Sequence, residues 1–119
     1  MNIEDFREAC LYLPYTEETL PFDDQTLVYK IGNKMYALIG MDNPNNCNLK
    51  CNPEYSLELR ATYKGITPGF HMNKTHWNTV KFNEDVDDQL IIELLNHSYQ
   101  LVWNKLPQKL KETLSNGTI

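Results

Sequence analysis

The residues best suited to contact another molecule lie in one short segment, residues 71–78. This segment reads His-Met-Asn-Lys-Thr-His-Trp-Asn, so it combines imidazole, amide and ammonium donors with a large aromatic ring. Lys74 can meet a phosphate as a point charge, and Asn73 and Asn78 can hydrogen-bond base edges or a nucleic-acid backbone. Trp77 can stack on a base or anchor a protein partner. The same residue types also satisfy backbone groups in turns and fill cores, so the segment predicts either a binding surface or a structural turn.

Lysines elsewhere in the chain can extend this surface through strand alternation. In residues 77–82, alternation places Trp77 and Lys81 together on the open face of a sheet, where an exposed tryptophan would indicate binding. Lys30 and Lys50 alternate with apolar neighbours in their own predicted strands and can share that face. A solvated sheet face is the alternative for each lysine. The candidate nucleic-acid-binding residues are therefore Lys30, Lys50, Asn73, Lys74, His76, Trp77, Asn78 and Lys81.

Zinc binding is a second chemistry that the residue types allow, because cysteine and histidine side chains are common zinc ligands. The candidates are Cys47, Cys51, His71 and His76. Their spacing argues against it, since nineteen residues separate the second cysteine from the first histidine. If residues 47–51 form a strand, both thiols point into the core as small apolar groups. We predict no metal site.

Hydrolytic chemistry needs a nucleophile beside a base, and the adjacent pair is His97 and Ser98. Neighbouring positions on a helix point about 100° apart, so Ser98 is predicted to be a packing residue. The chain also lacks a glycine-rich phosphate loop and every other cofactor fingerprint. We therefore expect a binding module with no catalytic residue and no cofactor rather than an enzyme.

Hydrophobic spacing and capping residues predict the elements that position these groups. They are a helix over residues 3–13 capped by Asn2, an acidic turn at residues 16–19, a hairpin of strands 26–31 and 34–41 around Gly32-Asn33, a strand at residues 47–51, a helix from Pro53 capped by Asn52, short strands on both sides of segment 71–78, and a long helix from Asp87 that Pro107 kinks or restarts. This order is α-β-β-β-α-β-β-α. It predicts an α+β fold, a two-layer α/β domain whose antiparallel sheet has helices on one face, and one domain over residues 1–119.

Charge is distributed unevenly along the chain. The 119 residues carry a formal net charge of −5, which argues against coating nucleic acid through overall charge. Residues 1–29 hold one base and seven acids, whereas residues 50–81 hold five bases and two acids. We expect any anion-binding site to lie in the second of these stretches.

The same composition bears on the compartment of the protein. The longest apolar run, residues 36–41, is far shorter than the roughly 18 residues that a membrane span needs. The acidic start of the chain has no apolar signal region, and an odd count of three cysteines favours reduced thiols over a disulfide framework. We predict a cytoplasmic protein with no membrane partner.

Two runs of residues resemble a known family. Leu-Lys-Cys-Asn-Pro-Glu at 49–54 and Thr-Pro-Gly-Phe-His-Met-Asn-Lys-Thr-His-Trp-Asn-Thr-Val at 67–80 closely resemble the MmcQ/YjbR-like family of small bacterial proteins. The likeness extends to residues 20–22, 28–38 and 97–107. It implies a two-layer α/β domain with a double-wing fold that is described as DNA-binding and is also similar to secretion chaperones.

Two functions follow from these observations. The first is DNA binding through the open sheet face and segment 71–78. The alternative is a protein-interaction or chaperone-like domain that binds a peptide or forms a homodimer. We expect the chain to be a monomer or a weak homodimer. A contiguous positive sheet face would favour DNA, and an apolar patch there would favour a protein.

Overall fold

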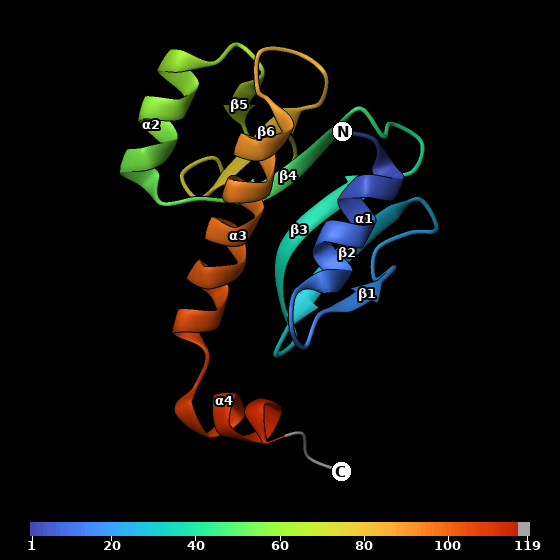
Figure 1. The fold of residues 1–119 in the computed structure, drawn as a ribbon, viewed down its shortest axis with the longest axis vertical. Helices are drawn as coiled ribbons and strands as arrows, with labels where there is room; N and C mark the ends of the chain where they lie inside the picture. Colours follow the sequence, from blue (N-terminus) through green and yellow to red (C-terminus); the bar gives the residue numbers. More distant parts are fainter. Residues whose placement is uncertain (117–119) are drawn as a thin grey trace.

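The computed structural model describes residues 1–116 and contains one sheet with four helices (Figure 1). The helices are α1 (Ile3–Tyr12), α2 (Pro53–Thr62), α3 (Asp88–Lys105) and α4 (Gln108–Ser115). The strands are β1 (Glu17–Thr19), β2 (Thr26–Ile31), β3 (Lys34–Gly40), β4 (Asn46–Lys50), β5 (Ile66–Pro68) and β6 (Trp77–Lys81). All neighbouring strands are antiparallel, in the order β1-β2-β3-β4-β6-β5. The predicted α+β class and element order are confirmed, with β1 and α4 as additions.

The predicted helix starts are confirmed by their capping hydrogen bonds. The side chains of Asn2, Asn52 and Asp87 each accept a hydrogen bond from a backbone N–H in the first turn of α1, α2 and α3. These bonds satisfy donors that have no partner within the helix. Pro107 ends α3 and begins α4, so the long helix restarts rather than kinks.

The extra strand β1 forms because tertiary contacts hold an acidic segment that we expected to be a turn. The carboxylate of Glu18 accepts two hydrogen bonds from the guanidinium of Arg7, each 2.9 Å long, and one of 2.7 Å from the hydroxyl of Tyr29. Three residues are too few for alternation to reveal a strand, and both partners of Glu18 are distant in sequence. The prediction for residues 16–19 was wrong for this reason.

The hairpin between β2 and β3 turns where the sequence predicts it. Gly32 has φ +53° and Asn33 has φ +66°, the left-handed conformation that a two-residue hairpin turn requires. A Cβ atom on Gly32 would also lie 2.9 Å from side-chain atoms of Leu106 and Leu110. Glycine suits the turn because of its φ, and a Cβ there would also make the side chains of Leu106 and Leu110 shift.

The two faces of the sheet differ, as predicted. Every buried apolar side chain from the helices belongs to the core on one face, together with alternate strand residues such as Tyr29 and Ile39. The opposite face carries a smaller cluster of Val28, Leu38 and Trp77, with no helical member. Trp77 lies on the open face but is only 7% exposed. The expectation of an exposed tryptophan was wrong, because side chains of the β5–β6 loop and β3 cover the ring.

Ser98 of α3 stands between β3 and β4 in the middle of the sheet. These strands share only the pairs Ala37↔Leu49 and Leu38↔Asn48 among the described residues. Beyond them, the Ser98 hydroxyl accepts a 2.9 Å hydrogen bond from the Lys50 N–H and donates one of 2.5 Å to the Tyr36 carbonyl oxygen. The hydroxyl replaces a direct strand-to-strand bond there. Figure 1 shows α3 running past both strands, so the sheet divides at this line into β1-β2-β3 and β4-β6-β5.

Two further expectations concern the cysteines and membranes. The cysteines are free and buried, as expected for reduced thiols: Cys10, Cys47 and Cys51. Within residues 1–116, no helix has both the length and the hydropathy to cross a bilayer.

Replacing Ser98 with alanine is predicted to destabilise the fold by about 1–3 kcal/mol, because a buried N–H and a buried carbonyl oxygen then lose their shared partner. Urea unfolding followed by circular dichroism measures this change. Ser115→Ala is the matched control, since that serine is exposed near the end of α4. Equal unfolding free energies for the two variants would contradict the bridging role of Ser98.

Candidate functional site

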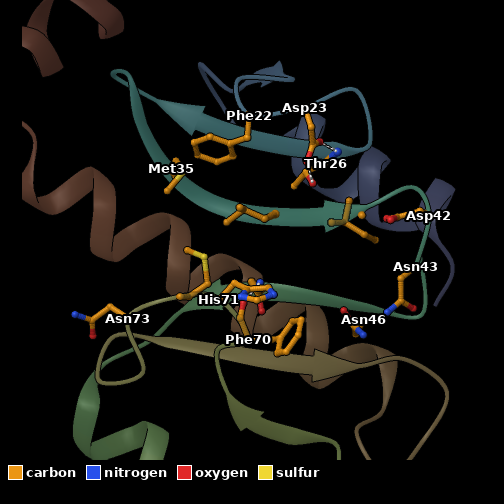
Figure 2. Close-up of a pocket in the computed structure, with 15 residues that line it drawn as sticks. Phe22, Asp23, Thr26, Met35, Asp42, Asn43, Asn46, Phe70, His71 and Asn73 are labelled. Carbon is orange, nitrogen blue, oxygen red and sulfur yellow. Dashed lines mark hydrogen bonds between the residues drawn. The ribbon is translucent and has the colours of Figure 1, made fainter.

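A groove lies on the open face of the sheet, between two loops (Figure 2). Its floor is formed by β3 and β4, and its walls are the β1–β2 loop, with Phe22 and Asp23, and the β5–β6 loop, with residues 70–73. It has a volume of about 630 Å³, which is in the range of ligand-binding clefts. We call this feature the open-face groove.

The β5–β6 wall of the groove is held in place by side-chain hydrogen bonds. The Thr79 hydroxyl donates to Asn48 Oδ1 over 2.6 Å and accepts from the Phe70 N–H over 2.9 Å. Asn73 Oδ1 accepts from two backbone N–H groups within its own turn, and the Lys74 ammonium donates to the Gly69 carbonyl oxygen over 2.9 Å. The wall is therefore preorganised rather than free to collapse onto the floor.

The groove lining mixes apolar side chains with four asparagines, and its charged groups are acidic. Phe22 and Phe70 are 65% and 68% exposed on opposite walls, and the His71 ring packs on Phe70 with 4.0 Å between ring centroids. Asp23 and Asp42 are the charged residues of the lining, which contains no lysine or arginine. Backbone N–H groups that donate to Asp23 lower the pKa of its carboxyl, so it is ionised at neutral pH.

Three predicted site residues have structural roles. Asn78 is buried, accepts a 2.8 Å hydrogen bond from Arg60 Nε and donates one of 3.2 Å to the Ser56 hydroxyl, so it ties β6 to α2. Asn73 shapes its own turn, and Trp77 fills the open-face cluster. These three residues of segment 71–78 therefore make contacts of the structural kind, and their part in binding stays a prediction.

The other candidate residues do not form one surface. Lys81 lies at the end of β6 opposite Asn46, whereas Lys50 lies at the other end of the same strand pair, opposite Trp77. Lys30 is two strands away from Lys50 in β2, and His76 is exposed in the β5–β6 loop. The structure therefore spreads the predicted lysines along and across the sheet.

A different group of lysines does converge, at the end of the sheet where β3 begins and β4 ends. Lys34 and Lys105 join Lys50 there around a cavity of about 260 Å³. Burial and the charges of Lys105 and Lys34 lower the pKa of Lys50. The cavity, which we call the lysine pocket, is lined by Lys34, Lys50, Val102, Lys105, Leu106 and Pro107. Sequence reasoning missed two of its lysines because they lie outside the locally basic stretch.

The catalytic and metal chemistries considered from the sequence find no assembled site. Ser98 is buried with both hydrogen-bonding directions occupied, and His97 Nε2 accepts a 3.2 Å hydrogen bond from the Asn52 N–H. Burial raises the pKa of the Cys47 and Cys51 thiols, which keeps them protonated. No three His, Cys, Asp or Glu side chains within residues 1–116 are grouped as metal ligands.

The fold and site define a small α+β domain with helices on one face of its sheet and a groove on the other. The chain matches the YjbR family model over residues 11–101. It is 34% identical over 115 residues to the Escherichia coli O157:H7 protein named uncharacterized protein YbdF, with 96% of this chain and 94% of that protein covered. It is 29% identical over 115 residues to the Escherichia coli K12 protein YjbR, covering 96% and 98%.

Solved structures agree with this match. A crystal structure of Deinococcus radiodurans protein DR2400, a DUF419 domain, has a TM-score of 0.89 at 41% identity and covers 95% of this chain and 87% of that one. A crystal structure of a Pseudomonas syringae protein has a TM-score of 0.72 at 30% identity and covers 86% and 99%. The chain belongs to the YjbR family, which confirms the resemblance seen in the sequence. The names of these relatives state no activity.

The pKa of Lys50 is predicted to rise in a Lys105→Met variant, because one of the two positive charges that oppose its protonation is removed. Titration of the lysine side-chain carbons by NMR measures this shift directly. Lys81→Met, which removes a charge at the opposite end of the sheet, should leave the pKa of Lys50 unchanged. A wild-type Lys50 that titrates at the ordinary lysine value would contradict the arrangement of the pocket.

Proposed function

We propose that the protein is a non-catalytic binding module that holds an extended segment of a partner protein in the open-face groove. One observation carries the proposal: the lining of the groove combines apolar side chains and asparagine amides with two carboxylates, and it has no lysine or arginine. Such a lining disfavours the phosphates of a nucleic acid and favours apolar side chains accompanied by a basic group.

The groove supplies what an extended peptide needs. Phe22 and Phe70 face each other as exposed aromatic anchors on walls whose floor includes Met35 and Leu38 (Figure 2). The side-chain amide of Asn46 has no hydrogen-bond partner within residues 1–116 and can pair with a peptide backbone. A lysine or arginine of the partner would lie near Asp42 at the acidic end.

The absence of catalysis is part of the proposal, and three features support it. The serine of the His97-Ser98 pair bridges two strands. The histidine accepts a hydrogen bond from the N–H of Asn52, the residue before α2. Burial keeps the Cys47 thiol protonated. A cytoplasmic location is also proposed, because three free buried cysteines suit a reducing compartment.

DNA binding is the second candidate, and the lysine pocket is the observation that favours it. None of its three ammonium groups has a carboxylate within ion-pair distance in residues 1–116. So few charges predict weak binding that falls steeply with salt.

Selection from a phage-displayed library of random peptides tests the groove. The enriched sequences are expected to place apolar residues at alternate positions, with a lysine or arginine at one end. A synthetic peptide of the enriched type should lose about tenfold in affinity for Phe70→Ser, because an aromatic anchor is removed. Isothermal titration calorimetry gives the affinities.

Leu57→Ser is the matched control for that variant. Leu57 is 66% exposed on α2, far from the groove lining, so its removal should change the affinity by less than about twofold. Failure to enrich any peptide, or equal losses in the two variants, contradicts the proposal. Light scattering measures the molar mass in solution and tests whether a second copy of the chain occupies the groove. A wild-type homodimer that becomes a monomer in Phe70→Ser would identify that second copy as the ligand instead of a peptide.

For DNA, fluorescence anisotropy of a labelled duplex at low and moderate salt is the direct test. Saturable binding that weakens with salt and in a Lys34→Met/Lys105→Met double variant would establish this candidate, because those changes remove phosphate-neutralising charges. Lys64→Met, which removes an exposed lysine outside the pocket and outside the candidate nucleic-acid-binding residues, serves as the single-charge control. No binding by the folded wild type at low salt removes DNA from consideration.

A further inference from the structure

The lysine pocket is built from three segments that are distant in sequence. Lys34 opens β3, Lys50 closes β4, and Lys105 occupies the last turn of α3. Their side chains surround a cavity of about 260 Å³ whose remaining walls are apolar. The apolar lining residues are Val102, Leu106 and Pro107.

Structural roles account for one of the three lysines but not for the group. Lys105 complements the partial negative charge at the C-terminal end of α3. Lys50 has no such partner: it is half-buried, and the nearest charges that act on it are those of two other lysines. In residues 1–116, neither a hydrogen bond nor a carboxylate compensates any of the three ammonium groups. Concentrating like charges around an apolar cavity lowers stability, which is typical of sites that bind a ligand of opposite charge.

We propose that the lysine pocket binds the phosphate group of a small phosphorylated molecule. A phosphate dianion supplies the counter-charge that the three ammonium groups lack, and its oxygens accept their N–H bonds. The apolar walls of Val102, Leu106 and Pro107 offer contacts to the organic part of the ligand. At about 260 Å³, the cavity is smaller than the 300–1,000 Å³ of sites for drug-sized ligands, so it fits a compact phosphate ester.

The pocket and the open-face groove share no lining residue, so the two proposals can fail independently. A phosphate on a DNA backbone has the same chemistry as a phosphate ester, and the experiment must separate these two sources. The size of the pocket and the convergence of its lysines favour the small molecule, because three lysines around one cavity of about 260 Å³ meet a single group instead of following a backbone.

Chemical-shift mapping with inorganic phosphate, pyrophosphate, glycerol 3-phosphate and glycerol tests the proposal on the whole protein. The three phosphates should shift the signals of Lys34, Lys50 and Lys105 in a saturable way, and glycerol should not. Affinity for glycerol 3-phosphate should fall at least tenfold in Lys50→Met and in Lys105→Met. It should remain unchanged in Lys81→Met, which removes an exposed lysine outside the pocket.

Urea unfolding separates ligand loss from misfolding. Because Lys50→Met removes repulsion between like charges, its unfolding midpoint should equal or exceed that of the wild type; if that variant fails to fold, Lys105→Met carries the test. Absence of saturable shifts with all three phosphates overturns the proposal. Shifts of the same signals by duplex DNA, without any by the small phosphates, also overturn it and assign the pocket to a DNA backbone.

Discussion

The hydroxyl of Ser98 is the contact on which the rest of the structure depends. An ordinary sheet would continue its pairing from Ala37↔Leu49 to Tyr36 and Lys50. Here a hydroxyl from α3 accepts a hydrogen bond from the Lys50 N–H of β4 and donates one to the Tyr36 carbonyl oxygen of β3. Within residues 1–116, every buried side-chain nitrogen and oxygen has a hydrogen-bond partner. The side chain of a helix thereby bridges two strands of the sheet. We call the line between β3 and β4, where the two three-stranded halves meet, the seam.

The seam positions both candidate binding features. On the open face, β3 and β4 provide the floor of the groove, while loops from the two halves form its walls. At the end of the seam, the gap that Ser98 fills brings Lys50 beside Lys34 and next to the last turn of α3. The groove is acidic and apolar, whereas the pocket is basic. One division of the sheet thus produces two sites of opposite charge without a second domain.

Local sequence signals predict most of the fold but little of the candidate sites. Caps, turn residues and alternation identify the helix starts, the hairpin and the open face, because each depends on neighbours within a few residues. The burial of Trp77 depends on Met72 and Met35, which only the folded sheet brings over the ring. The charge count grouped Lys50 with Lys81 because both lie in the locally basic stretch of residues 50–81. The register of β4 and β6 places these two lysines at opposite ends of the strand pair, and the packing of β3 and α3 brings Lys34 and Lys105 to Lys50, a convergence that no local spacing encodes.

Amide exchange combined with long-range NMR couplings tests the seam most directly. If the Ser98 hydroxyl stands between the strands, the Lys50 amide proton is protected from exchange like the amides of the neighbouring strand pairs, because it is held in a 2.9 Å hydrogen bond. The same arrangement predicts no scalar coupling through a hydrogen bond between the Lys50 amide and the Tyr36 carbonyl carbon. A measurable coupling between that amide and that carbonyl would show that β3 and β4 pair directly, and would contradict the division of the sheet. Rapid exchange of the Lys50 amide would contradict it as well.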